Sequence, residues 1–128
     1  MRTWVLAAIA LAASAGSSAA QDATAGEQVF KKFCVACHEV GADAKTRLGP
    51  PLNGIDGRQS ASLEGFNYSQ ANKASGITWK EDTFSKYIRA PMQEMPGTRM
   101  AFAGVKNDKE VADLWAYLKQ FGTDGDKK

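Results

Sequence analysis

The feature that most constrains the fold of this chain is a long central stretch, residues 39–77, that has no regular hydrophobic pattern. Its residues follow neither the 3.6-residue period of a helix nor the alternation of a strand, and glycines interrupt it repeatedly. Connections longer than about 12–15 residues without structure of their own are uncommon in compact domains. The stretch is therefore either disordered or wrapped around a ligand. Its large apolar residues favour wrapping; they are Leu48, Leu52, Ile55, Leu63, Phe66 and Tyr68, with Trp79 just beyond.

The first 20 residues have the pattern of a cleaved secretory signal peptide. Arg2 gives a short positive region, Trp4–Ala13 form an apolar core, and the small residues at 18–20 suit a cleavage site. We therefore expect residues 1–20 to be removed and residues 21–128 to form one domain in the periplasm. The mature chain has a net charge of +1, which argues against a nucleic-acid partner. No later segment approaches the roughly 18 apolar residues that stable membrane insertion requires.

The mature chain is poor in large apolar side chains. Leu, Ile, Val and Phe together make up 19 of 108 residues, or 18%. A fraction below about 20% is typical of disorder only when the net charge is high, and here it is close to zero. The composition therefore predicts a folded domain whose core is completed by something other than protein.

Three segments carry helix signals, and each begins with a residue that can cap a helix three positions before a glutamate. The pairs are Thr24 with Glu27, Thr78 with Glu81, and Asn107 with Glu110. Apolar side chains at helical spacing follow each pair. The second run stops at Pro91, whereas the third extends to Phe121, where Gly122 can provide the C-terminal cap. The sequence thus predicts an all-α domain with three main helices and no sheet of consequence.

The chemistry of the chain is concentrated in residues 34–38, where its only two cysteines precede its only histidine. The spacing Cys34-x-x-Cys37-His38 is the attachment signature of a c-type haem. Two thiols near a helix end can add to the two vinyl groups of one porphyrin, and the adjacent imidazole then faces the iron. Two alternatives are weaker. A redox-active cysteine pair is expected in a βαβ context, which is absent here, and a zinc site would be one ligand short.

A second axial ligand for the iron must come from another residue type, because His38 is the only histidine. The soft candidates in the mature chain are Met92, Met95 and Met100. Met92 and Met95 stand beside prolines, where each can simply pack in the core. Met100 follows the turn at residues 96–99, which favours it as a ligand that arrives from a loop.

With these motifs in place, the chain resembles class I c-type cytochromes, and most closely the bacterial cytochrome c2 and mitochondrial cytochrome c group. The resemblance covers residues 25–121 through several motifs in order. They are residues 34–38, 49–54, 57–58, 65–68, 76–79, 96–100 and 114–118. It implies the class I cytochrome c fold, in which helices and long loops wrap around one haem c that is covalently attached through Cys34 and Cys37.

The resemblance also implies roles for individual residues. Met100 takes the place of the second axial ligand, and Pro50 that of the residue whose carbonyl accepts the His38 Nδ1–H. Arg58, Tyr68 and Trp79 match residues around a haem propionate. Asn72, Tyr87 and Thr98 match a polar network beside the methionine, and Phe102 matches an aromatic residue near the exposed haem edge. Gly26 and Phe30 match the crossing of the first and last helices, with Leu114 and Tyr117 opposite.

The function implied is that of a one-electron carrier and not of an enzyme. We expect a monomer that takes electrons from a quinol-oxidising cytochrome complex and gives them to a terminal oxidase or a photosynthetic reaction centre. A haem peroxidase, a dehydrogenase subunit or a ligand-sensing haem protein would each require Met100 to be unbound. Related cytochromes often surround the haem edge with lysines. Here Phe33 precedes Cys34, and a thinner ring of cations is expected from Lys32, Lys45, Arg47, Arg99 and Lys106.

Overall fold

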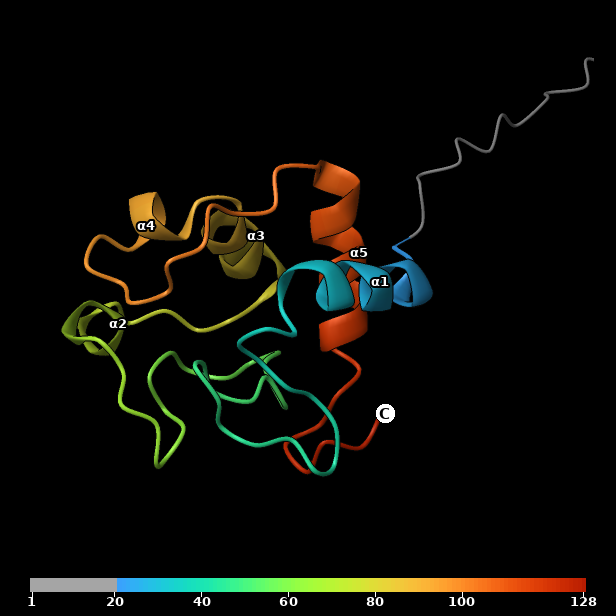
Figure 1. Ribbon diagram of the computed structural model, residues 1–128, viewed down its shortest axis with the longest axis horizontal. Coiled ribbons are helices and arrows are strands. Elements are labelled where there is room, and N and C mark those ends of the chain that lie inside the picture. Colours follow the sequence, from blue (N-terminus) through green and yellow to red (C-terminus); the bar gives the residue numbers. More distant parts are fainter. Residues whose placement is uncertain (1–20) are drawn as a thin grey trace, which may run out of the picture.

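In the computed structural model, which describes residues 21–128, the chain folds as helices joined by long loops (Figure 1). The five helices are α1 (Ala23–Phe33), α2 (Gln70–Ala74), α3 (Glu81–Arg89), α4 (Pro91–Glu94) and α5 (Asp108–Leu118). Across these described residues the only β-pairing is two isolated bridges, Gln59 with Thr78 and Phe121 with Lys127. The expected all-α fold with three main helices is therefore confirmed, whereas the predicted signal segment 1–20 lies outside the described residues.

The contact between α1 and α5 is the most extensive between any two helices (Figure 1). Gly26 is buried where they cross, and a Cβ there would lie 1.9 Å from the carbonyl oxygen of Asp113. Only glycine therefore allows the two backbones to approach this closely. The rings of Phe30 and Tyr117 pack beside this point with centroids 5.6 Å apart. The crossing that the resemblance implied is present.

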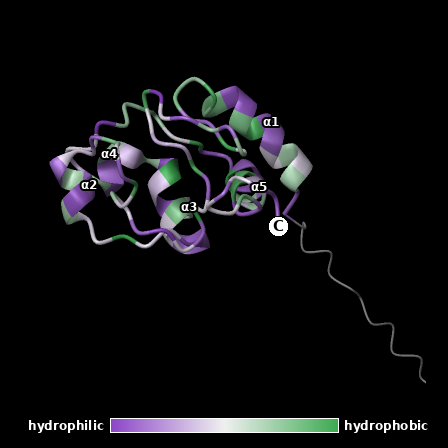
Figure 2. Cartoon of the chain, turned by 90° about the horizontal axis from the view of Figure 1, so that it is seen from below, coloured by the Kyte–Doolittle hydropathy of each residue, from purple (hydrophilic) through white to green (hydrophobic). Residues whose placement is uncertain are grey.

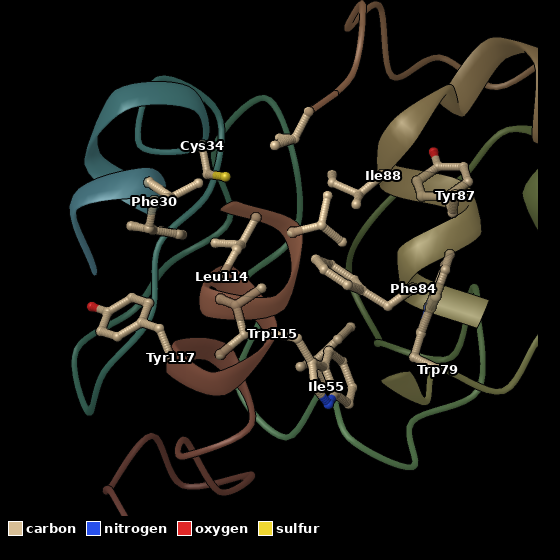
Figure 3. Close-up of a cluster of buried hydrophobic side chains, with 14 of the residues drawn as sticks. Phe30, Cys34, Ile55, Trp79, Phe84, Tyr87, Ile88, Leu114, Trp115 and Tyr117 are labelled. Carbon is tan, nitrogen blue, oxygen red and sulfur yellow. The ribbon is translucent and has the colours of Figure 1, made fainter. Parts of the chain in front are cut away.

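The core surrounds the second half of α5, where residues 113–118 are all buried, and continues onto α3. Leu114 of α5 is fully buried and lies between Phe30 and Cys34 on one side and Phe84 and Ile88 on the other (Figure 3). Hydrophobic and hydrophilic residues alternate around α1 and α3, so each helix presents an apolar face to this core (Figure 2). Burying such side chains stabilises the fold by roughly 1.5–3 kcal/mol each.

The helix start agrees with the sequence at α5 and differs at the other two main helices. Asn107 caps α5 and accepts the N–H of Glu110, as predicted. Asp22 rather than Thr24 caps α1, because its carboxylate accepts the N–H groups of Thr24 and Ala25. The prediction was wrong there by two residues.

The start of α3 differs more. Lys80 occupies the N-cap position, and the hydroxyl of Thr83 both accepts the Lys80 N–H and donates to the Thr78 carbonyl. Thr78 therefore takes part through its backbone and not as the cap. At the other end of α5, the helix stops at Leu118, so Gly122 is not its cap. Pro91 does end α3 as expected, but it also begins the short helix α4.

The aperiodic stretch 39–77 is held by specific hydrogen bonds instead of by regular structure. The side-chain amide of Asn53 forms two hydrogen bonds with the backbone of Gly41. Its Oδ1 accepts the Gly41 N–H at 2.9 Å, and its Nδ2 donates to the Gly41 carbonyl at 2.8 Å. Arg58 and Trp79 are connected through a backbone bond of 2.8 Å. The stretch also contains α2, which the sequence analysis missed because a five-residue helix shows too little periodicity.

Within residues 21–128, none of the helices is both long enough and apolar enough to cross a membrane.

Candidate functional site

A cavity of about 780 Å³ lies between α1, α3, α5 and the long loops, and its lining is mainly apolar. This volume is in the range of sites for small molecules and cofactors. All twelve residues singled out from the sequence line it, although they come from segments spread over 69 positions of the chain. They are Cys34, Cys37, His38, Pro50, Arg58, Tyr68, Asn72, Trp79, Tyr87, Thr98, Met100 and Phe102.

The two cysteines reach the cavity because α1 ends immediately before them. Cys34 is the C-terminal cap of α1, and its carbonyl accepts the N–H groups of both Cys37 and His38. This tight turn places the three side chains on the same wall. Both thiols are free, and burial raises the pKa of Cys34 to about 12. Such a thiol stays protonated at neutral pH, which does not suit a redox-active cysteine pair.

His38 is held in one orientation by the loop that follows it. Its Nδ1 lies 2.8 Å from the carbonyl oxygen of Pro50, and since a carbonyl only accepts, Nδ1 carries the proton. Burial lowers the pKa of His38, more than the bond to Pro50 raises it. The imidazole is therefore neutral at pH 7 and its Nε2 keeps a lone pair, as a metal ligand must.

Gly49 explains how the ring can lie so close to the loop. A Cβ at this position would lie 2.3 Å from His38 Cε1 and 2.7 Å from Nδ1. In the sequence, Gly49 opens the motif at residues 49–54, and the motif alone assigns it no role. Only the tertiary structure shows that its missing side chain makes room for the imidazole.

Met100 lies on another segment of the cavity wall, where two hydroxyl groups hold it. The hydroxyl of Tyr87 donates to Met100 Sδ over 3.4 Å and lies 3.1 Å from Thr98 Oγ1. Thr98 Oγ1 in turn accepts the backbone N–H of Met100 at 3.2 Å. The thioether thus has a fixed position and lone pairs available to the cavity.

The other two candidate methionines do not line the cavity. Met92 is 55% exposed on the surface of α4, whereas Met95 is 4% exposed within the hydrophobic core. The structure therefore favours Met100 as the ligand over both alternatives.

Arg58 is a half-buried cation in the lining of the cavity. Its Nη1 donates to the carbonyl oxygens of Pro51 and Asn53 at 2.9 and 3.0 Å, and burial lowers its pKa. Tyr68 and Trp79 are buried nearby in the same lining. No salt bridge is found for this half-buried guanidinium among the described residues, so this wall is suited to an anionic group of a ligand.

Asn72 provides a second indication that the cavity binds a polar group of a ligand. Its Oδ1 is buried and has no hydrogen-bond partner among the residues that the structure describes. Such an orphaned acceptor is uncommon in native proteins. Asn72 does not bond to Tyr87 or Thr98, so the network beside Met100 consists of those two residues without it.

Phe102 lies at the solvent side of the cavity and packs on Phe33. Their ring centroids are 6.0 Å apart in an edge-to-face arrangement. The sequence places Phe33 on the apolar face of the first helix, at a position before Cys34 where a lysine was absent, and the structure adds that it lines the cavity.

Taken together, the lining suits a c-type haem. It offers two thiols for attachment, a neutral imidazole and a thioether as iron ligands, apolar walls for the porphyrin and a guanidinium for its carboxylates. The fold and this cavity thus define the class: a helical protein whose long loops enclose a site that fits a c-type haem.

Comparison with known proteins agrees with this class. The sequence pattern of the family described as Cytochrome c matches residues 23–122. The chain is 56% identical to cytochrome c2 of Blastochloris viridis over 128 residues, which is all of both chains. It is 54% identical to cytochrome c-550 of Nitrobacter winogradskyi over 107 residues, covering 84% of this chain and 97% of the relative. The chain therefore belongs to the cytochrome c family, as a class I c-type cytochrome.

Proposed function

We propose that this chain is a one-electron carrier that holds a single haem c through Cys34 and Cys37, with His38 and Met100 as the two axial ligands of its iron. The observation that carries the proposal is that His38 and Met100 line the same cavity and that each is held in place by its own hydrogen bond. When bound, the haem supplies an iron that alternates between the ferrous and ferric states.

The residues of the chain determine how this cofactor behaves. Pro50 orients His38 and increases its basicity, while Tyr87 orients Met100. Ile55, Phe84 and Leu114 keep water from the porphyrin. With His38 and Met100 as its two protein ligands, the iron would have no position left for a substrate, and we therefore propose a carrier rather than an enzyme.

The cell compartment and the partners follow from the predicted signal segment and from the relatives. We propose that the mature chain is a periplasmic monomer that moves between a quinol-oxidising cytochrome complex and a terminal oxidase or reaction centre. The resemblance to proteins named cytochrome c2 and cytochrome c-550 supports this assignment.

Three measurements on the holoprotein test the proposal. The haem should stay with the protein during acid–acetone extraction, and its loss to the organic phase would contradict covalent attachment. Membranes of the producing bacterium should reduce the protein with quinol and should oxidise it with oxygen or light, and pathway inhibitors should identify the complexes. The protein should turn over peroxide poorly; rapid turnover that Met100→Ala does not increase would favour an enzyme.

A further inference from the structure

The segment that follows α5, residues 119–128, forms a closed loop. The backbone N–H of Gly122 donates to the carbonyl oxygen of Asp126 at 2.9 Å. Phe121 and Lys127 form one of the two isolated bridges, so the two arms of the segment run side by side. We call residues 119–128 the clasp.

The clasp packs against the long loop 39–77 at two points. At the first, the carbonyl oxygen of Phe121 accepts the N–H of Gly54 at 2.9 Å. At the second, Gly125 is buried, and a Cβ there would lie 2.2 Å from the carbonyl oxygen of Gly41. Gly125 also has a φ of +85°, so glycine is required both for the backbone conformation and for the close approach. Figure 1 shows the clasp, in red, beside the teal part of this loop.

Asn53 connects these two points to the wall of the cavity. It precedes Gly54 in the chain, and its side-chain amide holds both backbone groups of Gly41, at 2.9 and 2.8 Å. Its own carbonyl oxygen accepts a hydrogen bond from Arg58 Nη1 at 3.0 Å. Arg58 lines the cavity, whereas Asn53 and Gly41 lie behind the lining. A continuous series of contacts therefore joins the clasp to the cation of the cavity.

The direction of the Arg58 guanidinium depends on the turn that contains Asn53. Nη1 donates to the carbonyl oxygens of Pro51 and Asn53, which lie two positions apart in this turn. A guanidinium carries five N–H donors in a rigid plane, so two bonds at Nη1 fix the whole group. The donors on Nε and Nη2 form no hydrogen bond with the described residues, which leaves them for a ligand. A shift of the turn would therefore turn these donors away from that ligand.

We propose that the clasp positions Arg58 against the carboxylates of the haem, with Gly125 as the positioning residue. Its effect passes through Gly41 and Asn53. The proposal rests on the function proposed above. Ferric iron carries one more positive charge than ferrous iron, so a cation held nearby favours the ferrous state. A clasp that cannot dock should loosen Arg58 and thereby lower the reduction potential.

The test is a redox titration of holoprotein variants. Gly125→Ala places a Cβ against Gly41 and prevents the clasp from docking. Gly76→Ala is the matched control, because Gly76 also has a positive φ, +65°, but a Cβ there would meet nothing within 4 Å, and the residue does not line the cavity. Asn53→Ala removes both bonds to Gly41 and leaves the clasp itself unchanged.

The equilibrium constant for one-electron reduction should fall about threefold in Gly125→Ala, a shift of about 30 mV. Asn53→Ala should lower it by a similar factor, and Gly76→Ala should match the wild type. Hydrogen exchange in the reduced holoprotein gives an independent readout. The Gly41 N–H, which Asn53 Oδ1 accepts, should exchange about tenfold faster in Gly125→Ala and at the wild-type rate in Gly76→Ala.

A double-mutant cycle shows whether the effect passes through Arg58. Arg58→Gln removes the cation and should lower the equilibrium constant about tenfold, or about 59 mV. Adding Gly125→Ala to this variant should give no further fall, because the group on which the clasp acts is already absent. A merely structural role of the clasp would instead lower the potential equally in both backgrounds.

The outcomes separate this proposal from the one on which it rests. A shift that persists fully beside Arg58→Gln, or faster Gly41 exchange with an unchanged potential, would overturn the positioning role and leave the carrier function intact. If Gly125→Ala does not fold, Asn53→Ala decides, and an unchanged potential there overturns the proposal. A wild type without a reversible one-electron couple would instead refute the carrier function itself.

Discussion

The hydroxyl of Tyr87 donates a hydrogen bond to the thioether of Met100, with Oη and Sδ 3.4 Å apart. The same hydroxyl lies 3.1 Å from Thr98 Oγ1, so its direction is fixed. Burial raises the pKa of Tyr87, which keeps the hydroxyl protonated and able to donate. A donor on the sulfur withdraws electron density from the atom that we assign as iron ligand, and this relationship leads to the first prediction.

Tyr87→Phe should lower the reduction potential. Without the hydrogen bond the sulfur is a stronger electron donor, which stabilises ferric iron relative to ferrous. If the bond contributes roughly 0.5–1 kcal/mol, the shift should be about 20–40 mV for one electron. Redox titration of the holoprotein measures it. Thr98→Val is the control that leaves the Tyr87 hydroxyl in place, and it should give a smaller shift; an unchanged potential in Tyr87→Phe would contradict the reasoning.

Met100→Ala should open the sixth coordination position. The sulfur-to-iron charge-transfer band should disappear, the potential should fall, and cyanide or carbon monoxide should bind. Met92→Leu and Met95→Leu should keep the band, because neither residue lines the cavity. Visible spectra of the three variants show which methionine gives rise to the charge-transfer band. Survival of the band in Met100→Ala would show that another residue is the ligand.

Gly26→Ala should destabilise the crossing of α1 and α5. The added Cβ would lie 1.9 Å from the Asp113 carbonyl oxygen and 2.8 Å from Tyr117 Cβ, so the two backbones must separate. We expect the free energy of unfolding to fall by about 3 kcal/mol, as measured by denaturant titration. Gln28→Ala, on the exposed side of the same helix, should change it by less than about 0.5 kcal/mol. Equal stability of the two variants would mean that the crossing relaxes without cost.

Asp113 should make the stability of the protein depend on pH. Its buried carboxylate accepts the N–H of Asp22 at 2.9 Å and pairs with Lys109 Nζ at 2.7 Å. Burial alone would raise the pKa of Asp113, but these two bonds together lower it below its ordinary value. A lowered pKa in the folded state means that the stabilisation is complete above the unfolded pKa of about 3.9 and is lost as the pH falls through the folded value.

Asp113→Asn should therefore lower the free energy of unfolding by about 1–2 kcal/mol at pH 7, and the difference from the wild type should shrink as the pH falls below about 4. Denaturant titrations of both proteins at several pH values measure this. Asp124→Asn, an exposed position, is the control and should show no such trend. A difference that grows toward low pH would contradict the assignment.

Much of the fold could be predicted from the sequence because its signals are local. The third helix was expected from Val111, Leu114 and Leu118 at helical spacing, and its cap Asn107 was identified correctly. The cap of α1 was misplaced because both Asp22 and Thr24 can accept the first backbone N–H groups, and that of α3 because the helix begins after Lys80, which provides no side-chain cap. Which of Asp22 and Thr24 does so depends on the position of α5, whose Asp113 holds the N–H of Asp22.

The sequence by itself determined the chemistry of this protein. Cys34, Cys37 and His38 are adjacent along the chain, so their spacing alone indicates haem attachment, and the shortage of aliphatic residues indicates that a cofactor completes the core. The tertiary structure alone decided why Gly49 must lack a side chain and that Lys32 and Arg47 are paired with carboxylates. It also placed Met100, which the sequence already favoured, in the cavity lining and the other two candidate methionines outside it. These relationships join residues far apart in the chain. They depend on how the long loops close around the cavity, and hydrophobic periodicity carries no information about that closure.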